Sequence, residues 1–122
     1  MKGKIPDKML GALLDALPLE LTLTDAGDRI VAWTEPKNKI FQRKDEILGT
    51  DVRKCHSEKS QAKVEKLLQD LKSGKKDNAV TIIDCKGLDG KPAKILVEYA
   101  AVRSPDGKYL GCLETCRYAD EK

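Results

Sequence analysis

Apolar residues recur at helical spacing in two separate stretches of the chain. Both stretches follow an i, i+3, i+4, i+7 pattern, which places the apolar residues on one face of an α-helix. Pro18 should end the first helix and Gly74 the second, because proline cannot continue a helix and glycine suits its C-terminal end. Ser57 stands where it can cap the second helix, which we expect to run to about residue 73. The two stripes are Leu10, Leu13, Leu14 and Leu17 in the first helix, and Val64, Leu67, Leu68 and Leu71 in the second.

The first helix is too short to be stable alone in water. We therefore expect its apolar stripe to pack on the domain's own sheet or on a second subunit. These patterns divide the chain into an N-terminal amphipathic helix at residues 1–18, a main domain at 19–118 and a polar tail at 119–122.

The other regular pattern is an alternation of apolar and polar residues, which is typical of β-strands. Leucine alternates with polar residues over 19–24, and this predicts a half-buried strand. Turn residues then lead into a second strand at 29–33, which makes a hairpin. Residues 34–57 are polar and interrupted by Pro36 and Gly49, which indicates loops and short helical turns. Three further strands are expected at 79–85, 93–103 and 109–118, separated by turns at 87–90 and 104–107.

Hairpins join most of these strands, so the sheet should be antiparallel. Five strands with helices gathered in the middle of the chain predict an α+β domain with the helices packed on one face of the sheet. The length of 122 residues suits one domain of this kind.

Composition narrows the choice of partners. Charged residues make up 35% of the chain, yet the net charge is only +3, so neither a nucleic-acid nor a membrane partner is expected. The lysines along the second helix alternate with acidic residues, which indicates a solvated face. No apolar run approaches the roughly 18 residues of a membrane helix. With no export signal at the N-terminus, we expect a cytoplasmic protein.

The four cysteines are Cys55, Cys85, Cys112 and Cys116, and in a cytoplasmic protein they should be reduced thiols. Cys112 and Cys116 would share one face of a strand, about 13 Å apart, which is too far for one metal ion. We therefore predict that both thiols pack in the interior, and that Cys85 is structural as well.

The order of elements resembles that of a PAS domain, with two strands, short helices, one longer helix and three strands. The resemblance covers about residues 10–119. It implies a sensory and signalling module that holds a small ligand or cofactor between sheet and helices. PAS domains bind haem, flavin, small metabolites or nothing, so the resemblance does not identify a ligand. The segments that carry it are Leu17–Asp25, Gly27–Trp33, Glu46–Val52 and Ser104–Gly111.

One segment resembles a PAS subgroup more closely. Residues 52–60 are similar to a Cys-His-Pro-Pro-Lys-Ser element found in PAS domains that are often joined to hemerythrin-like regions. Here Ser57 and Glu58 stand where that element has two prolines.

The same segment holds the main candidate for cofactor chemistry. His56 is the only histidine of the chain, and Cys55 precedes it. Imidazole and thiolate both bind haem iron or zinc. The PAS resemblance places both side chains beside the ligand pocket, so His56 is a candidate metal ligand and haem a possible cofactor. The alternative is that His56 is a local hydrogen-bonding residue at a helix N-terminus. Val52 stands where covalent haem attachment would need a cysteine.

Other side chains are weaker candidates for the pocket. Trp33 and Phe41 are candidate cofactor-binding residues of its wall, since small-ligand sites are mostly apolar, although plain core packing would also explain them. Glu98 and Glu114 are carboxylates inside strands, and we expect both to face outward. If either faced inward, it would need a partner and become a ligand-binding candidate.

Our leading hypothesis is a PAS-type module that binds a small ligand and relays its state through a homodimer or a separate signalling protein. Three alternatives remain: a haem-dependent gas or redox sensor that uses His56, a ligand-free dimerisation module, and a thiol enzyme that acts through Cys55. We expect no enzyme, because catalytic Cys and His residues usually come from separate segments and no Gly-x-Ser-x-Gly element occurs.

Overall fold

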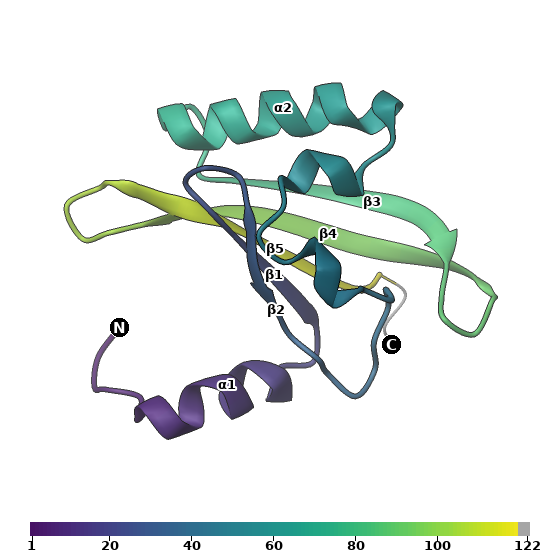
Figure 1. The fold of residues 1–122 in the computed structure, drawn as a ribbon, viewed down its shortest axis with the longest axis horizontal. Coiled ribbons are helices and arrows are strands. Elements are labelled where there is room, and N and C mark those ends of the chain that lie inside the picture. Colours follow the sequence, from purple (N-terminus) through teal and green to yellow (C-terminus); the bar gives the residue numbers. More distant parts are fainter. Residues whose placement is uncertain (120–122) are drawn as a thin grey trace.

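The computed structural model describes residues 1–119, and these fold around one antiparallel sheet (Figure 1). Its spatial order is β2-β1-β5-β4-β3, so the first and last strands of the chain pair at the centre. This confirms the predicted α+β fold. From residue 120 onward, the predicted tail lies outside the described residues. The strands are β1 (Glu20–Asp25), β2 (Ile30–Trp33), β3 (Asn78–Lys86), β4 (Pro92–Arg103) and β5 (Tyr109–Tyr118).

The two α-helices lie on opposite sides of this sheet (Figure 1). α2 (Glu58–Ser73) covers one side together with two 3₁₀ helices, η1 (Asp45–Ile47) and η2 (Val52–Cys55), while α1 (Asp7–Ala16) lies on the other. We call the side under α2 the inner face and the opposite side the outer face.

Most predicted helix ends agree with the structure, and one predicted interaction does not occur. α2 ends at Gly74, whose φ of +82° is a backbone conformation that glycine adopts readily. α1 ends at Ala16, two residues before Pro18, because the residue before a proline favours an extended backbone. Ser57 is the N-cap residue of α2, but its hydroxyl pairs with the hydroxyl of Ser60 (3.2 Å) and makes no capping bond to the backbone. The predicted side-chain cap is therefore wrong.

The strand β1 is half-buried as predicted, but its polar side chains are the buried ones. Glu20, Thr22 and Thr24 are only 4–5% exposed and face inward. Leu21 and Leu23 face outward and are half-buried. The inner face of the sheet is therefore partly polar at its centre.

The apolar core lies between the inner face and the elements that cover it. One cluster joins α2 to β5, and the other joins β4 and β5 to the segment before η1. Cys112 and Cys116 are 3% and 2% exposed, and each packs in one of these clusters. The members are Val64, Leu68, Leu71 and Cys112 in the first cluster, and Ile40, Ile95, Val97 and Cys116 in the second.

Candidate functional site

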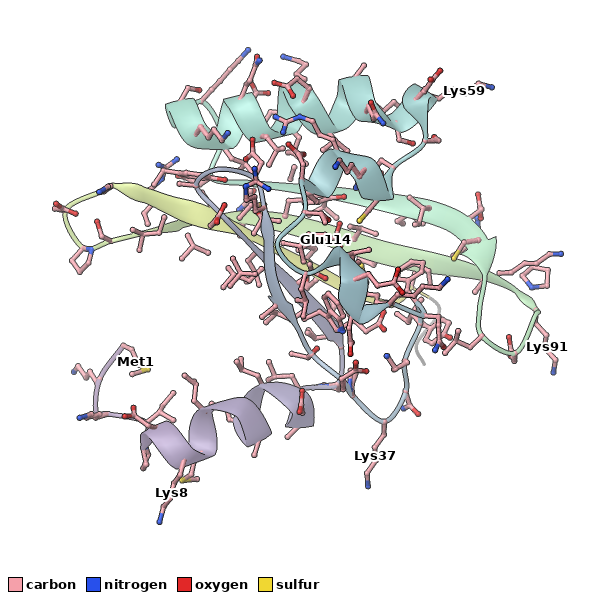
Figure 2. The ribbon with its side chains drawn as sticks, in the orientation of Figure 1. Met1, Lys8, Lys37, Lys59, Lys91 and Glu114 are labelled. Atoms are coloured by element: carbon pink, nitrogen blue, oxygen red, sulfur yellow. The ribbon has the colours of Figure 1, made fainter. Side chains whose placement is uncertain are left out.

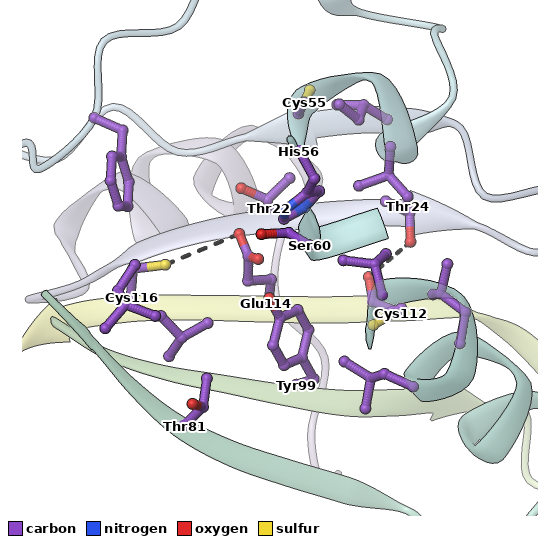
Figure 3. A pocket seen from close by; sticks show the side chains of 18 of the residues that line it. Thr22, Thr24, Cys55, His56, Ser60, Thr81, Tyr99, Cys112, Glu114 and Cys116 are labelled. Carbon is purple, nitrogen blue, oxygen red and sulfur yellow. Dashed lines mark hydrogen bonds between the residues drawn. The ribbon is translucent and has the colours of Figure 1, made fainter. Parts of the chain in front are cut away.

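A cavity of about 830 Å³ lies between α2, the 3₁₀ helices and the inner face of the sheet (Figure 3). Its walls are mostly apolar, with side chains such as Val64 and Leu67 from α2 and Ile47 from η1. Sites for small molecules have typical volumes of roughly 300–1,000 Å³ and walls of this kind. The cavity is therefore large enough for a metabolite or a cofactor.

A row of polar side chains crosses the sheet side of this cavity. Glu114 on β5 pairs in register with Thr22 on β1 and with Tyr99 on β4, so all three side chains point to the inner face. All three line the cavity, and Figure 3 shows Glu114 between the other two. We call Thr22, Glu114 and Tyr99 the polar row.

Glu114 is held by several neighbouring groups. Arg43 lies 3.6 Å from Glu114 Oε1, and both side chains are largely buried. The Cys116 thiol donates to the same oxygen at 3.9 Å. The prediction that Glu114 faces outward is therefore wrong, because the register with Thr22 and Tyr99 turns it inward, where these donors compensate its charge. Glu98 does face outward and pairs with Arg117 at 3.4 Å.

Tyr99 remains protonated at physiological pH. Burial raises the pKa of its hydroxyl far above the usual range, and the nearby charge of Glu114 raises it further. Tyr99 therefore presents a neutral hydroxyl to Glu114 and to any molecule in the cavity.

His56 and Cys55 both line the cavity from the end of η2. His56 is half-buried, and Figure 3 shows its side chain near Ser60. Cys55 is largely exposed, yet partial burial still raises the pKa of its thiol, and only Arg43 opposes this shift. A thiolate at Cys55 is therefore disfavoured at neutral pH.

The two aromatic candidates lie in different places. Phe41 lines the cavity, and its backbone N–H donates to the Glu20 carboxylate at 3.2 Å. Trp33 is not among the lining residues. Its indole N–H donates to Glu35 at 3.1 Å, and the Arg43 guanidinium lies 6.0 Å from the ring centroid. Trp33 therefore does not form the cavity wall. Its ring lies under Arg43, which does line the cavity.

A network of charged groups holds η2 in place next to the cavity. Arg53 of η2 donates to Asp28 (3.0 Å), to Asp51 (3.1 Å) and to Glu65 of α2. Asp28 is 4% exposed, lies in the turn between β1 and β2, and also accepts from Lys72 of α2 at 2.6 Å. We call these five residues the Arg53 network. It connects the part of the wall that carries His56 to α2 and to the first hairpin.

Sequence reasoning missed several residues of the cavity. Arg43, Thr22 and Tyr99 were not proposed for the site, and Glu114 was expected outside it. The signal that could have indicated these cavity residues was the presence of polar residues within otherwise apolar strands. In the part of the chain that the structure describes, no group of three His, Cys, Asp or Glu side chains could hold a metal ion. A metal at His56 would therefore need other ligands, such as those of a haem.

A family model described as PAS domain matches residues 10–117. The chain belongs to the PAS domain family. Relatives of this family are sensory and signalling modules. The match identifies the family but not the subgroup with the Cys-His-Pro-Pro-Lys-Ser element, so membership of that subgroup stays a prediction.

Solved structures support the same fold. A C-terminal domain from Streptococcus mutans is 26% identical, with a TM-score of 0.83, over 98% of this PAS domain and 90% of that chain. A PAS domain from Colwellia psychrerythraea is 14% identical, with a TM-score of 0.67, over 94% and 98%. A sensory box sensor histidine kinase from Vibrio cholerae is 14% identical, with a TM-score of 0.63, over 94% and 92%. No curated protein matches the chain.

Within residues 1–119, neither α-helix is long and apolar enough to cross a lipid bilayer.

Proposed function

We propose that this PAS domain is a sensory module that binds a small ligand or cofactor in the cavity under α2. It relays the state of that ligand through a second copy of the chain or a separate signalling protein. The polar row of Thr22, Glu114 and Tyr99 in an otherwise apolar cavity carries this proposal. We propose no catalytic activity, because burial raises the pKa of the Cys55 thiol and so disfavours the thiolate that a thiol enzyme needs.

The orientation of β1 supports ligand binding over plain packing. A strand that only filled a core would bury Leu21 and Leu23 and expose its polar residues, because burying polar groups costs free energy. β1 does the opposite. The Thr24 hydroxyl donates to the carbonyl oxygen of Cys112 at 3.4 Å, whereas the Thr22 hydroxyl lines the cavity and is available to a bound molecule.

The Arg53 network supports the relay. Cys55 and His56 lie two and three residues after Arg53, so a ligand that moves this wall also strains the bonds to Asp28 and Glu65. A ligand that binds one arrangement of η2 better than another shifts the population between them. The first hairpin and α2 would respond together.

Native mass spectrometry of the protein purified from its own cell tests ligand binding. We expect a bound small molecule, and we expect Thr22→Val to weaken its binding roughly five- to tenfold, which corresponds to about one lost hydrogen bond. Thr115→Val is the matched control, because Thr115 is the outward neighbour of Glu114 on β5. Equal affinity of both variants would contradict the proposed role of the polar row.

Haem is a second candidate because His56 faces the cavity. If haem is bound, the His56 imidazole would hold its iron, with Cys55 beside it in the cavity wall, and the group would supply reversible gas binding or electron transfer. The absorption spectrum of protein reconstituted with haem, recorded for the wild type and for His56→Ala, tests this. A spectrum that does not change in the variant would rule out His56 as the iron ligand.

A further inference from the structure

Arg43 is a largely buried cation that the cavity wall holds without a hydrogen bond. Its side chain lines the cavity and is 15% exposed. Glu114 Oε1 lies 3.6 Å from the guanidinium, which is beyond the usual length of an N–H···O hydrogen bond. Among residues 1–119, no group accepts a hydrogen bond from this side chain. A guanidinium has five N–H donors, and leaving donors unpaired at a buried site costs free energy. Arg43 is therefore able to bind an acceptor on a molecule in the cavity.

The charged side chains around the cavity are mostly positive. Lys44 and Lys63 line the cavity as well, and both are exposed, so they lie on its solvent side. Among the described residues that line the cavity, Glu114 is the one acid. It is largely buried and lies near the middle of the molecule in Figure 2, whereas Lys59 reaches into solvent. A cleft with an excess of positive charge attracts anions.

Glu114 has partners other than Arg43. The Cys116 thiol donates to its Oε1 at 3.9 Å, and the protonated Tyr99 lies next to it in the polar row. A ligand can therefore take the donors of Arg43 without leaving Glu114 unpaired. A cationic ligand at Glu114 would instead lie close to the guanidinium, which would repel it.

We propose that the ligand of this cavity is a carboxylate on an apolar body, and that Arg43 binds its head group. This inference rests on the proposed function and names the chemical class of the ligand. The planar guanidinium can donate two parallel hydrogen bonds to the two oxygens of a carboxylate. The apolar body would pack against wall residues such as Ile47 and Leu67. Arg43 is then the residue that determines specificity for the charge of the ligand.

Isothermal titration calorimetry of the full chain with octanoate, octanol and octylamine tests the head group, because these three molecules share one apolar chain. We expect octanoate to bind roughly ten- to a hundredfold more tightly than octanol, since hydrogen bonds to a charged acceptor are the stronger ones. Octylamine should bind most weakly of the three. Octanoate that binds no more tightly than octanol, or does not bind, would overturn the proposal.

The variant Arg43→Gln tests the residue. We expect it to remove most of the preference for octanoate and to leave the affinity for octanol within about twofold, because an uncharged ligand gains little from a charged donor. Retained octanol binding also verifies that the variant is folded. Arg117→Gln is the matched control, since it removes the same charge from an exposed pair on the outer face. An Arg43→Gln chain that still prefers octanoate would show that another group binds the carboxylate.

The variant Glu114→Gln should act in the opposite direction. It removes the carboxylate that competes for Arg43 and repels an anionic ligand, so octanoate should bind about threefold more tightly or better. A residue that only supported the wall would not strengthen binding when it is changed. Weaker octanoate binding in this variant would contradict the assignment of the head group to Arg43.

Native mass spectrometry of the protein from its own cell distinguishes a failure of this inference from a failure of the proposed function. A bound carboxylate would support both. A bound molecule that is neutral or cationic would overturn the carboxylate assignment and leave the sensory function in place. A chain that carries no molecule would contradict the proposed function itself.

Discussion

Gly111 lies so close to β1 that no side chain fits there. It pairs with Asp25 across the two central strands. A Cβ at this position would overlap the carbonyl oxygen of Thr24 and press on the Cα of Asp25. Both are backbone atoms, so no rotamer change could relieve the contact.

Gly111→Ala should therefore destabilise the domain by about 1–3 kcal/mol or more, since the central pairing of the sheet must move apart. Gly11→Ala is the control, because a Cβ at this α1 position meets nothing within 4 Å and alanine favours a helix over glycine by roughly 1 kcal/mol. Urea unfolding of both variants measures the difference. A Gly111→Ala midpoint equal to that of the wild type would contradict this account.

Three of the four thiols should react with an alkylating reagent at different rates. Burial raises the pKa of Cys112 to about 12 and raises the pKa of Cys116 as well, so both are protonated and covered at pH 8. Cys55 is exposed, although its pKa is also raised. We expect iodoacetamide to label Cys55 before Cys112 and Cys116, yet more slowly than a free cysteine, and a ligand in the cavity to protect it. Peptide mass spectrometry after timed labelling measures these rates. Labelling of Cys112 or Cys116 before Cys55 would contradict the assigned burial of these thiols.

At the scale of elements, the Arg53 network joins three segments that are distant in sequence. Its bonds reach the first hairpin through Asp28 and α2 through Glu65. Neither contact is apolar, so the position of η2 depends on charge as well as on packing. The Arg53 side chain lowers the pKa of Glu65, and the Arg53 backbone N–H is the largest cause of the lowered pKa of Asp51.

These shifts give the network a pH dependence. A carboxylate whose folded pKa lies below its unfolded value, about 4 for Asp and Glu, adds stability that is complete above that value. The stability is lost as pH falls through the lower folded pKa. Arg53→Gln should reduce the stability of the domain at pH 7. As the pH falls below about 4, the variant should then lose less stability than the wild type. Arg117→Gln, which affects only an exposed pair, should change neither property. Thermal melts from pH 2.5 to 7 provide the comparison.

At the scale of the whole molecule, α1 and the sheet domain should behave as separable parts. No residue of α1 is buried, and the cavity is formed without it. Deletion of residues 1–16 should therefore leave a folded domain that still binds its ligand. Near-ultraviolet circular dichroism and native mass spectrometry measure these properties. An unfolded product would show that α1 packs on its own sheet in solution.

Local signals predicted most of the fold. The ends of α2 and the three C-terminal strands were predicted to within about one residue, because Gly74, the turn residues and the alternation act over a few neighbours. The order of elements then indicated the PAS fold, which the family match confirms. Of the predicted site residues, His56, Cys55 and Phe41 line the cavity and Trp33 does not.

The sequence could not predict which of the two faces of each strand points to the interior. Alternation in β1 shows that leucines and polar residues face opposite ways, but the same pattern results whichever set is buried. Only the pairing of Thr22 with Glu114, and of Glu114 with Tyr99, decides that the polar set faces the cavity. The sequence by itself therefore determined the elements, their order and the family, since these depend on neighbours along the chain. The polar row, the inward turn of Glu114 and the uncovered leucines of α1 were decided only in the tertiary structure, because each depends on which distant strands and helices meet.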